Sequence, residues 1–195
     1  MRGLLTDERC DEIKREIVYM FEECEVNTIP INCFEICRKL YYVLKPYSSL
    51  SPDEYFQALC ESQDAYCKVE VNPDTGMNQY VIYYNDHVSC IGRIRWSIFH
   101  EIGHIYLGHH DHPDDSLAKI EEAEANFFAK YAMTPPPLVN ATRCTSPEDI
   151  ASKFHTSQEF AGNSYSYYRK WMSYGSFDYE NFELKLLQLF NLIAA

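Results

Sequence analysis

Apolar residues recur every three to four positions along most of the chain, and this spacing is typical of amphipathic helices. Two shorter runs, 66–71 and 79–84, are instead rich in β-branched and aromatic residues, and the turn-forming segment 72–76 joins them. We therefore expect a mostly helical α+β fold with a small antiparallel hairpin. Helices are predicted over residues 7–24, 32–44, 51–60, 116–133, 147–154, 157–171 and 179–193.

The second strand of the hairpin leads directly into one more helical segment. One face of that helix carries a stripe of isoleucines: Ile91, Ile94, Ile98, Ile102 and Ile105. We predict that this stripe packs into the core. The opposite, less apolar face carries Trp96, Ser97 and two histidines.

These histidines belong to a His-Glu-x-x-His pattern, in which His100 and His104 are four residues apart. Four residues are slightly more than one helical turn, so both imidazoles can bind a single ion. Glu101 lies a quarter turn away, close to the ion but not bound to it. This is the arrangement of a zinc hydrolase, whose glutamate takes a proton from water activated by the metal. An ordinary amphipathic helix would leave the spacing unexplained, so we predict a zinc site with Glu101 as the general base.

Catalytic zinc usually has three protein ligands, and the sequence offers two kinds of candidate for the third. His110 follows His100 by ten residues, as in the metzincin pattern. The glycine of that pattern is Leu107 here, and Gly108 comes one position late. The other candidate is a carboxylate of the helix 116–133, which has glutamates at positions 121, 122 and 124.

The helical projection of residues 116–133 favours Glu122. Small residues lie on or beside its face, and they allow two helices to approach closely enough to share an ion. Glu121 is the second choice, and Glu124 points away. Asn126 lies one turn past Glu122, where it can hydrogen-bond a ligating histidine. Alternatively, the glutamates at positions 121, 122 and 124 form a solvent-exposed acidic face of an ordinary helix.

These segments together resemble the ImmA/IrrE family of metallo-endopeptidases. The resemblance rests on Arg-Trp-Ser-Ile-Phe-His-Glu-Ile-Gly-His at 95–104, on Glu-Ala-Glu-Ala-Asn at 122–126 and on a helix-turn-helix-like segment around 150–157. It implies a zincin-like metallopeptidase fold of the gluzincin type, with zinc held by His100, His104 and Glu122. It also implies cytoplasmic proteolysis of a specific protein, often a transcriptional repressor of a prophage or mobile element.

Composition limits the other functions that the chain could have. The 195 residues carry a formal net charge of −12, whereas a nucleic-acid surface needs clustered Lys and Arg. The second helix of the helix-turn-helix-like part has only Arg169 and Lys170 as cations. We therefore expect that part to pack or to dock a partner rather than to read DNA.

The chain also lacks the signals of an exported or membrane protein. No apolar run is long enough to cross a bilayer, and the N-terminal segment is too charged for a secretion signal. The eight cysteines are scattered without a Cys-x-x-Cys pair, so we expect reduced thiols. These features predict a cytoplasmic protein.

We expect a metallopeptidase domain over residues 1–137 and a C-terminal helical extension over 138–195, packed on it or continuous with it. The last helix has leucine on most sides, so it packs either on the body or on a second copy of the chain in a homo-oligomer.

The predicted function is zinc-dependent endoproteolysis of a protein substrate. The rival is a non-catalytic regulator, in which the zinc fold is a scaffold and the helix-turn-helix-like part binds a partner or DNA. Glu101 weighs against this rival, because a scaffold has no use for a general base. An extended substrate could pair with the free edge of strand 80–85, although a strand that only covers the helix fits equally well. The residue that stabilises the oxyanion stays open between His109, His110 and Tyr83.

Overall fold

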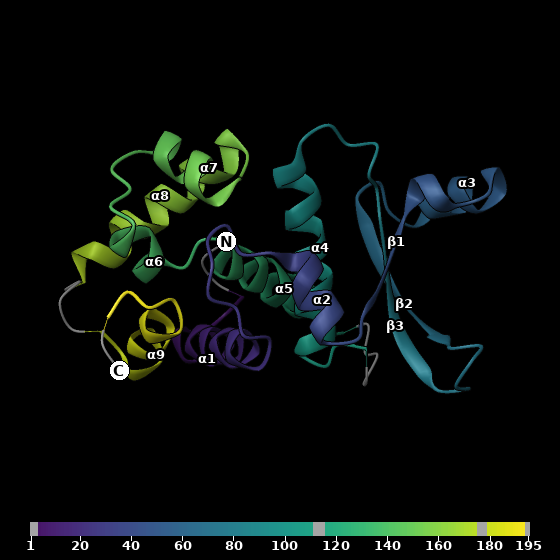
Figure 1. The fold of residues 1–195 in the computed structure, drawn as a ribbon, viewed down its shortest axis with the longest axis horizontal. Helices are drawn as coiled ribbons and strands as arrows, with labels where there is room; N and C mark the ends of the chain where they lie inside the picture. Colours follow the sequence, from purple (N-terminus) through teal and green to yellow (C-terminus); the bar gives the residue numbers. More distant parts are fainter. Residues whose placement is uncertain (1–3, 111–115, 175–178, 194–195) are drawn as a thin grey trace.

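The computed structural model describes residues 4–110, 116–174 and 179–193. At its centre, helix α4 (Ile91–Tyr106) packs along helix α5 (Ala118–Met133). A small sheet lies against one side of α4, and most other helices gather on the far side of this pair (Figure 1). The mostly helical α+β fold is confirmed.

Most of the other elements lie close to the predicted segments, whereas helix α6, strand β1 and the turn η1 were not predicted. The helices are α1 (Asp7–Glu23), α2 (Cys33–Lys39), α3 (Pro52–Glu61), α6 (Pro136–Ala141), α7 (Pro147–Phe154), α8 (Gln158–Ser173) and α9 (Asn181–Leu189), with a 3-10 turn η1 at Tyr47–Ser49. The strands are β1 (Val43–Pro46), β2 (Ala65–Val71) and β3 (Asn78–Tyr84).

The sheet has the order β1-β3-β2. Strand β2 pairs antiparallel with β3, with Ala65 opposite Tyr84, which confirms the predicted hairpin. Strand β1 adds a parallel partner on the other side of β3, with Val43 opposite Val81. Over residues 81–84, β3 is paired on both sides and has no free edge. The prediction that residues 80–85 offer an edge to a substrate is therefore wrong.

The predicted helix 32–44 was also wrong in its second half. Helix α2 ends at Lys39, and Tyr41 adopts a left-handed conformation with φ of 58°. The N–H of Tyr42 then donates to the carbonyl oxygen of Cys37 at 2.8 Å, which closes the helix end. Glycine is the residue that usually signals such an end. Because the left-handed residue here is Tyr41, no glycine marks the point at which the chain leaves the helix and forms β1.

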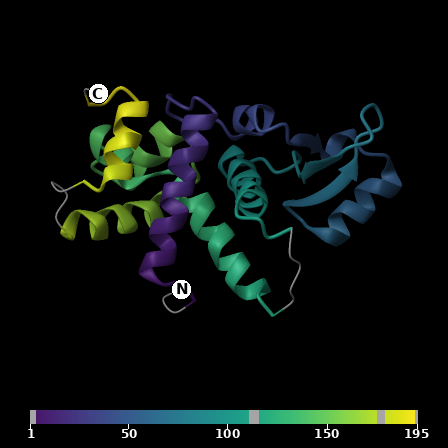
Figure 2. The same cartoon turned by 90° about the horizontal axis from the view of Figure 1, so that it is seen from below.

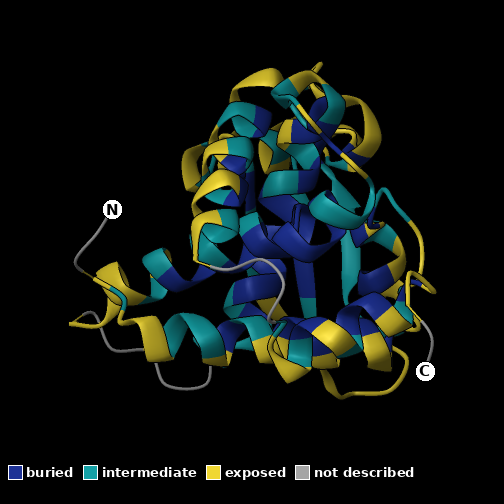
Figure 3. Cartoon of the chain, turned by 90° about the vertical axis from the view of Figure 1, so that its left-hand side faces the viewer, coloured by how far each residue is buried: buried dark blue, intermediate teal, exposed yellow. Residues whose placement is uncertain are grey.

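A single buried cluster joins the helices. It contains Ile98 and Ile102 of α4, as predicted, together with side chains of α1, α5 and α9, and Figure 3 shows the buried residues along the inner faces of the elements. Ile91 is 53% exposed, so the stripe does not extend to the first residue of α4.

Helix α1 packs on both α5 and α9, and it lies between them in Figure 2. Residues on both sides of position 137 belong to the same buried cluster, and the division there remains a prediction. Among the described helices, none is both long and apolar enough to cross a lipid bilayer.

Candidate metal centre

Three predicted ligands converge where α4 meets the first turns of α5. The Nε2 atoms of His100 and His104 are 3.1 Å apart, and oxygens of Glu122 lie 3.5 Å and 3.3 Å from them, respectively. Ligands held about 2.0–2.1 Å from a tetrahedral ion are about 3.3–3.4 Å from one another. The three side chains therefore have the spacing of a metal site, and they could hold one ion.

The electrostatics of the two histidines suit metal binding. Burial lowers the pKa of His104 to about 3 and also lowers the pKa of His100. Both imidazoles are therefore neutral at pH 7, which is the form that binds a metal ion. Asn126 interacts with His100, as the sequence suggested. Two neutral imidazoles beside a carboxylate form a donor set that fits a divalent cation.

Glu101 lies on α4 beside this group and is only 9% exposed. Its pKa is raised to about 7, mainly by burial and to a smaller extent by the negative charge of Glu122. The backbone N–H of Cys67 on β2 points at the Glu101 carboxylate and partly offsets the increase. A carboxyl group with a pKa close to neutral is suited both to accept and to return a proton.

The end of α4 turns sharply at Gly108, which has φ of 76°. The N–H of His109 then donates to the carbonyl oxygen of His104 at 3.0 Å, in the same kind of closure that ends α2. As a result, the His109 ring returns to His104, and the two Nδ1 atoms are 3.0 Å apart. The sequence did not predict the position of His109, although Gly108 directly before it is typical of a helix end.

Glu124 faces away from the ligands, as predicted, and is nearly buried. Its Oε2 lies 3.1 Å from Nε2 of His109, and both of its oxygens accept hydrogen bonds from Arg9 of α1 at 2.7 Å. Burial alone would raise the pKa of Glu124, but the hydrogen bonds from Arg9 and His109 outweigh it and lower the pKa. Sequence reasoning missed this pair, because nothing local connects residues 115 positions apart.

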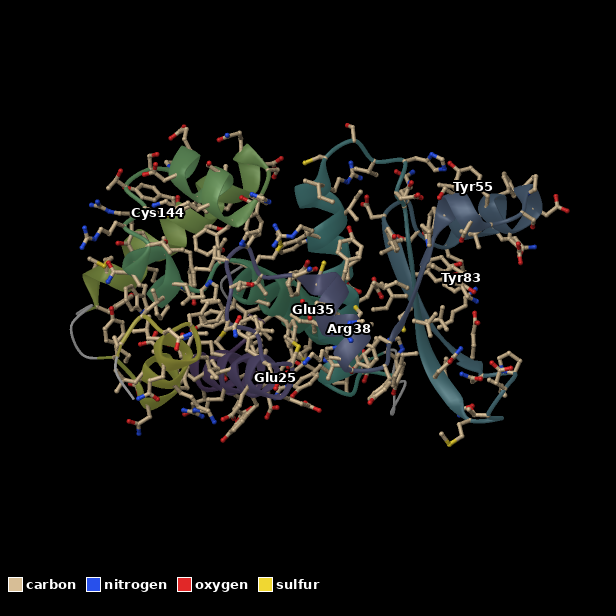
Figure 4. All side chains as sticks on the ribbon, in the orientation of Figure 1. Glu25, Glu35, Arg38, Tyr55, Tyr83 and Cys144 are labelled. Atoms are coloured by element: carbon tan, nitrogen blue, oxygen red, sulfur yellow. The ribbon has the colours of Figure 1, made fainter. Side chains whose placement is uncertain are left out.

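Two other candidates are separated from the ligand group. His110 lines the cleft, but it is not part of that group, and its ring centroid is 6.2 Å from that of His104. Tyr83 lies on the face of the sheet away from α4, as Figure 4 shows, and stacks on Tyr66 with ring centroids 4.9 Å apart. Tyr83 is therefore not placed to stabilise an oxyanion at this site, whereas His110 is in the cleft.

A cleft of about 510 Å³ opens over the candidate ligands. Its walls come from the end of α3, the start of β2, and the facing sides of α4 and α5. The lining residues are Glu61, Ser62, Asp64, Ala65, Tyr66, Cys67, Trp96, Ser97, His100, Glu101, His104, His110, Glu122 and Asn126. This lining, among the described residues, contains four carboxylates and no lysine or arginine.

Two packed helices that present His-Glu-x-x-His and a facing glutamate beneath a sheet edge define a zincin-like metallopeptidase fold. A family model described as the IrrE N-terminal-like domain, a peptidase family, matches residues 61–166. The match covers just over half of the chain, and the chain belongs to this family. A search of curated proteins finds no match. The matched segment includes all three candidate ligands but not α1.

Proposed function

We propose that this protein is a cytoplasmic zinc-dependent endopeptidase that cleaves a specific protein substrate. The observation that carries the proposal is the spacing of three donor atoms, 3.1 to 3.5 Å apart, directly beside the buried Glu101. His100, His104 and Glu122 would hold the ion. Bound zinc would supply a Lewis acid that polarises a carbonyl group and acidifies water.

In this proposal, Glu101 moves the proton. Its carboxylate accepts a proton from the attacking water as the new carbon–oxygen bond forms, and it delivers that proton to the leaving amine nitrogen as the carbon–nitrogen bond breaks. Its pKa near 7 supports both transfers, because neither protonation state is strongly favoured at neutral pH.

The substrate backbone would pair with β2 rather than β3. The carbonyl oxygen of Asp64 accepts from Asn85, and the N–H of Asn72 donates to Met77, so the even-numbered residues of this segment face β3. The odd-numbered residues therefore direct their N–H and C=O groups to the free edge. Residue 67 is one of them, and its N–H points at Glu101. An extended peptide that adds to this edge would place a peptide bond beside the proposed base.

The charge of the molecule supports a basic protein substrate. The net charge is −12, so a basic partner would be attracted to the molecule. DNA-binding proteins have such a charge. The family resemblance supports a transcriptional repressor of a prophage or mobile element as that partner.

The decisive experiment compares Glu101→Gln, Glu122→Ala and a control, Glu121→Ala, which changes a neighbouring acid outside the ligand group. We would measure zinc per chain by elemental analysis and cleavage of a proteome-derived peptide library by mass spectrometry. Glu101→Gln should keep zinc and lose at least about 100-fold in rate. Glu122→Ala should lose zinc, and Glu121→Ala should match the parent. A parent protein that binds no zinc, or a Glu101→Gln variant that cleaves normally, would refute the proposal.

A further inference from the structure

A continuous chain of polar contacts runs from the candidate ligand His104 to the N-terminal helix. The Nδ1 atom of His104 meets Nδ1 of His109 at 3.0 Å, and Nε2 of His109 meets Glu124 at 3.1 Å. Arg9 then binds both oxygens of Glu124 at 2.7 Å. The side chains of His109 and Glu124 are only 7% and 9% exposed, so these contacts are shielded from water.

The chemistry of each group in this chain selects one arrangement of protons. A histidine that binds metal through Nε2 keeps its hydrogen on Nδ1, so His104 donates to His109. His109 then accepts at Nδ1 and carries its own hydrogen on Nε2, which it donates to the Glu124 carboxylate. Glu124 must be ionised and correctly oriented for this, and the two parallel hydrogen bonds from Arg9 provide both conditions.

The other histidine, His100, has a different contact, which comes from Asn126. The Nδ1 atom of His100 is buried and has no hydrogen-bond partner among the described residues. The polar chain from Arg9 therefore bears on the orientation of His104. That chain ends at Arg9 on α1, which lies outside the segment 61–166 that matches the family.

We propose that Arg9 is a positioning residue of the metal centre, which acts through Glu124 and His109 to fix the tautomer and orientation of His104. This inference rests on the ligand set of the proposed function. It makes helix α1 part of the metal site as well as of the core. An arginine that only clamps α1 onto α5 would affect folding stability but leave the metal centre unchanged.

The test measures the zinc dissociation constant by chelator competition and the visible absorption spectrum of the Co²⁺-substituted protein. The variants are Arg9→Met, Glu124→Gln and the double variant, with Arg15→Met as the control for an exposed arginine on the same helix. Loss of such supporting contacts typically weakens metal binding by about 10–100-fold. We expect a loss of this size and an altered Co²⁺ spectrum for both single variants, and none for Arg15→Met.

The double variant separates a connected chain from two independent effects. If Arg9 acts only through Glu124, the zinc affinity of the double variant should equal that of whichever single variant has the lower affinity. A folded Arg9→Met protein with parental zinc affinity and Co²⁺ spectrum overturns the inference. If Arg9→Met does not fold, Arg9→Lys takes its place, because it keeps the charge and loses the paired geometry; parental values for it count equally against the inference. A parent that binds no zinc refutes the proposed function instead.

Discussion

Gly103 of α4 lies directly against Phe128 of α5, and a Cβ atom at position 103 would be 3.1 Å from the Cβ atom of Phe128. Neither backbone can move freely, because both residues are buried in the core between the two helices. The absence of a side chain at Gly103 therefore sets how closely α4 and α5 approach. The same approach brings Glu122 of α5 within reach of His100 and His104.

Replacing Gly103 with Ala should destabilise the protein by about 1–3 kcal/mol, because the added methyl group overpacks the contact between the helices. It should also weaken metal binding, since Glu122 would move away from the histidines. Chemical denaturation and chelator competition measure the two effects.

Gly162 of α8 provides a matched control, because a Cβ atom there would meet nothing within 4 Å. Gly162→Ala should stabilise the protein by up to about 1 kcal/mol, through the higher helix propensity of alanine. Equal effects at the two glycines would show that the approach of α4 and α5 is not limited by Gly103.

The sequence predicted those parts of the site that depend on local spacing. Two histidines four residues apart must share a helix face, and Glu122 lies on the side of its helix with small residues. His109 is a partial case, since Gly108 marks the helix end but does not reveal that the ring returns to His104. Arg9 could not have been found in this way, because its contact with Glu124 depends on how α1 packs across α5.

The sheet shows the same limit. The hairpin was predictable because its strands are long and joined by a turn. Strand β1 has only four residues, and the left-handed residue that precedes it is Tyr41 rather than glycine. The sequence therefore indicated a continuing helix. Without β1, β3 was expected to be an edge strand, and the substrate was therefore assigned to β3.

Arg95 is a second long-range anchor. Its guanidinium is buried at 6% exposure and donates to the carbonyl oxygens of Phe154 and His155 at the end of α7, and to that of Ile31 before α2. Arg95→Met should destabilise the protein by about 2–4 kcal/mol, because it leaves buried carbonyl groups without donors. Urea denaturation measures this change.

The control is Arg93→Met on the same helix. Arg93 is exposed and pairs with Asp64, so its replacement should change stability by less than about 1 kcal/mol. If Arg95→Met were equally mild, water would have to satisfy those carbonyl groups, and Arg95 would not hold α7 against α4.

Val69 tests the edge of β2. It is an odd-numbered residue of that strand, so its N–H faces the free edge, and proline would remove this donor without breaking the ladder to β3. Val69→Pro should raise KM for a cleaved peptide by about 3–10-fold, which corresponds to one hydrogen bond, at unchanged zinc content. Lys68→Pro should instead unfold the hairpin, because residue 68 bonds to β3. A Val69→Pro variant with parental KM would remove this part of the edge from substrate binding.

Glu183 of α9 makes stability depend on pH. Its side chain is buried beside Trp171, whose Nε1–H donates to Oε1 at 2.8 Å, and burial raises the pKa of Glu183 above its usual value of 4.5. Ionisation is therefore less favourable in the folded protein than in the unfolded chain. The corresponding stability is fully present below pH 4.5 and is lost as the pH rises through the raised pKa of the folded state.

Glutamine at position 183 cannot ionise, and its carbonyl oxygen can still accept from Trp171. The stability of Glu183→Gln relative to the parent should therefore increase between pH 4 and pH 8, whatever its value at pH 4. Urea denaturation at several pH values measures the difference, and Glu16→Gln, at an exposed position of α1, should show no such trend. A relative stability of Glu183→Gln that falls as the pH rises would mean that Glu183 is better stabilised as an anion in the folded protein, by the hydrogen bonds from Trp171 and the Glu180 backbone and by the charge of Lys14.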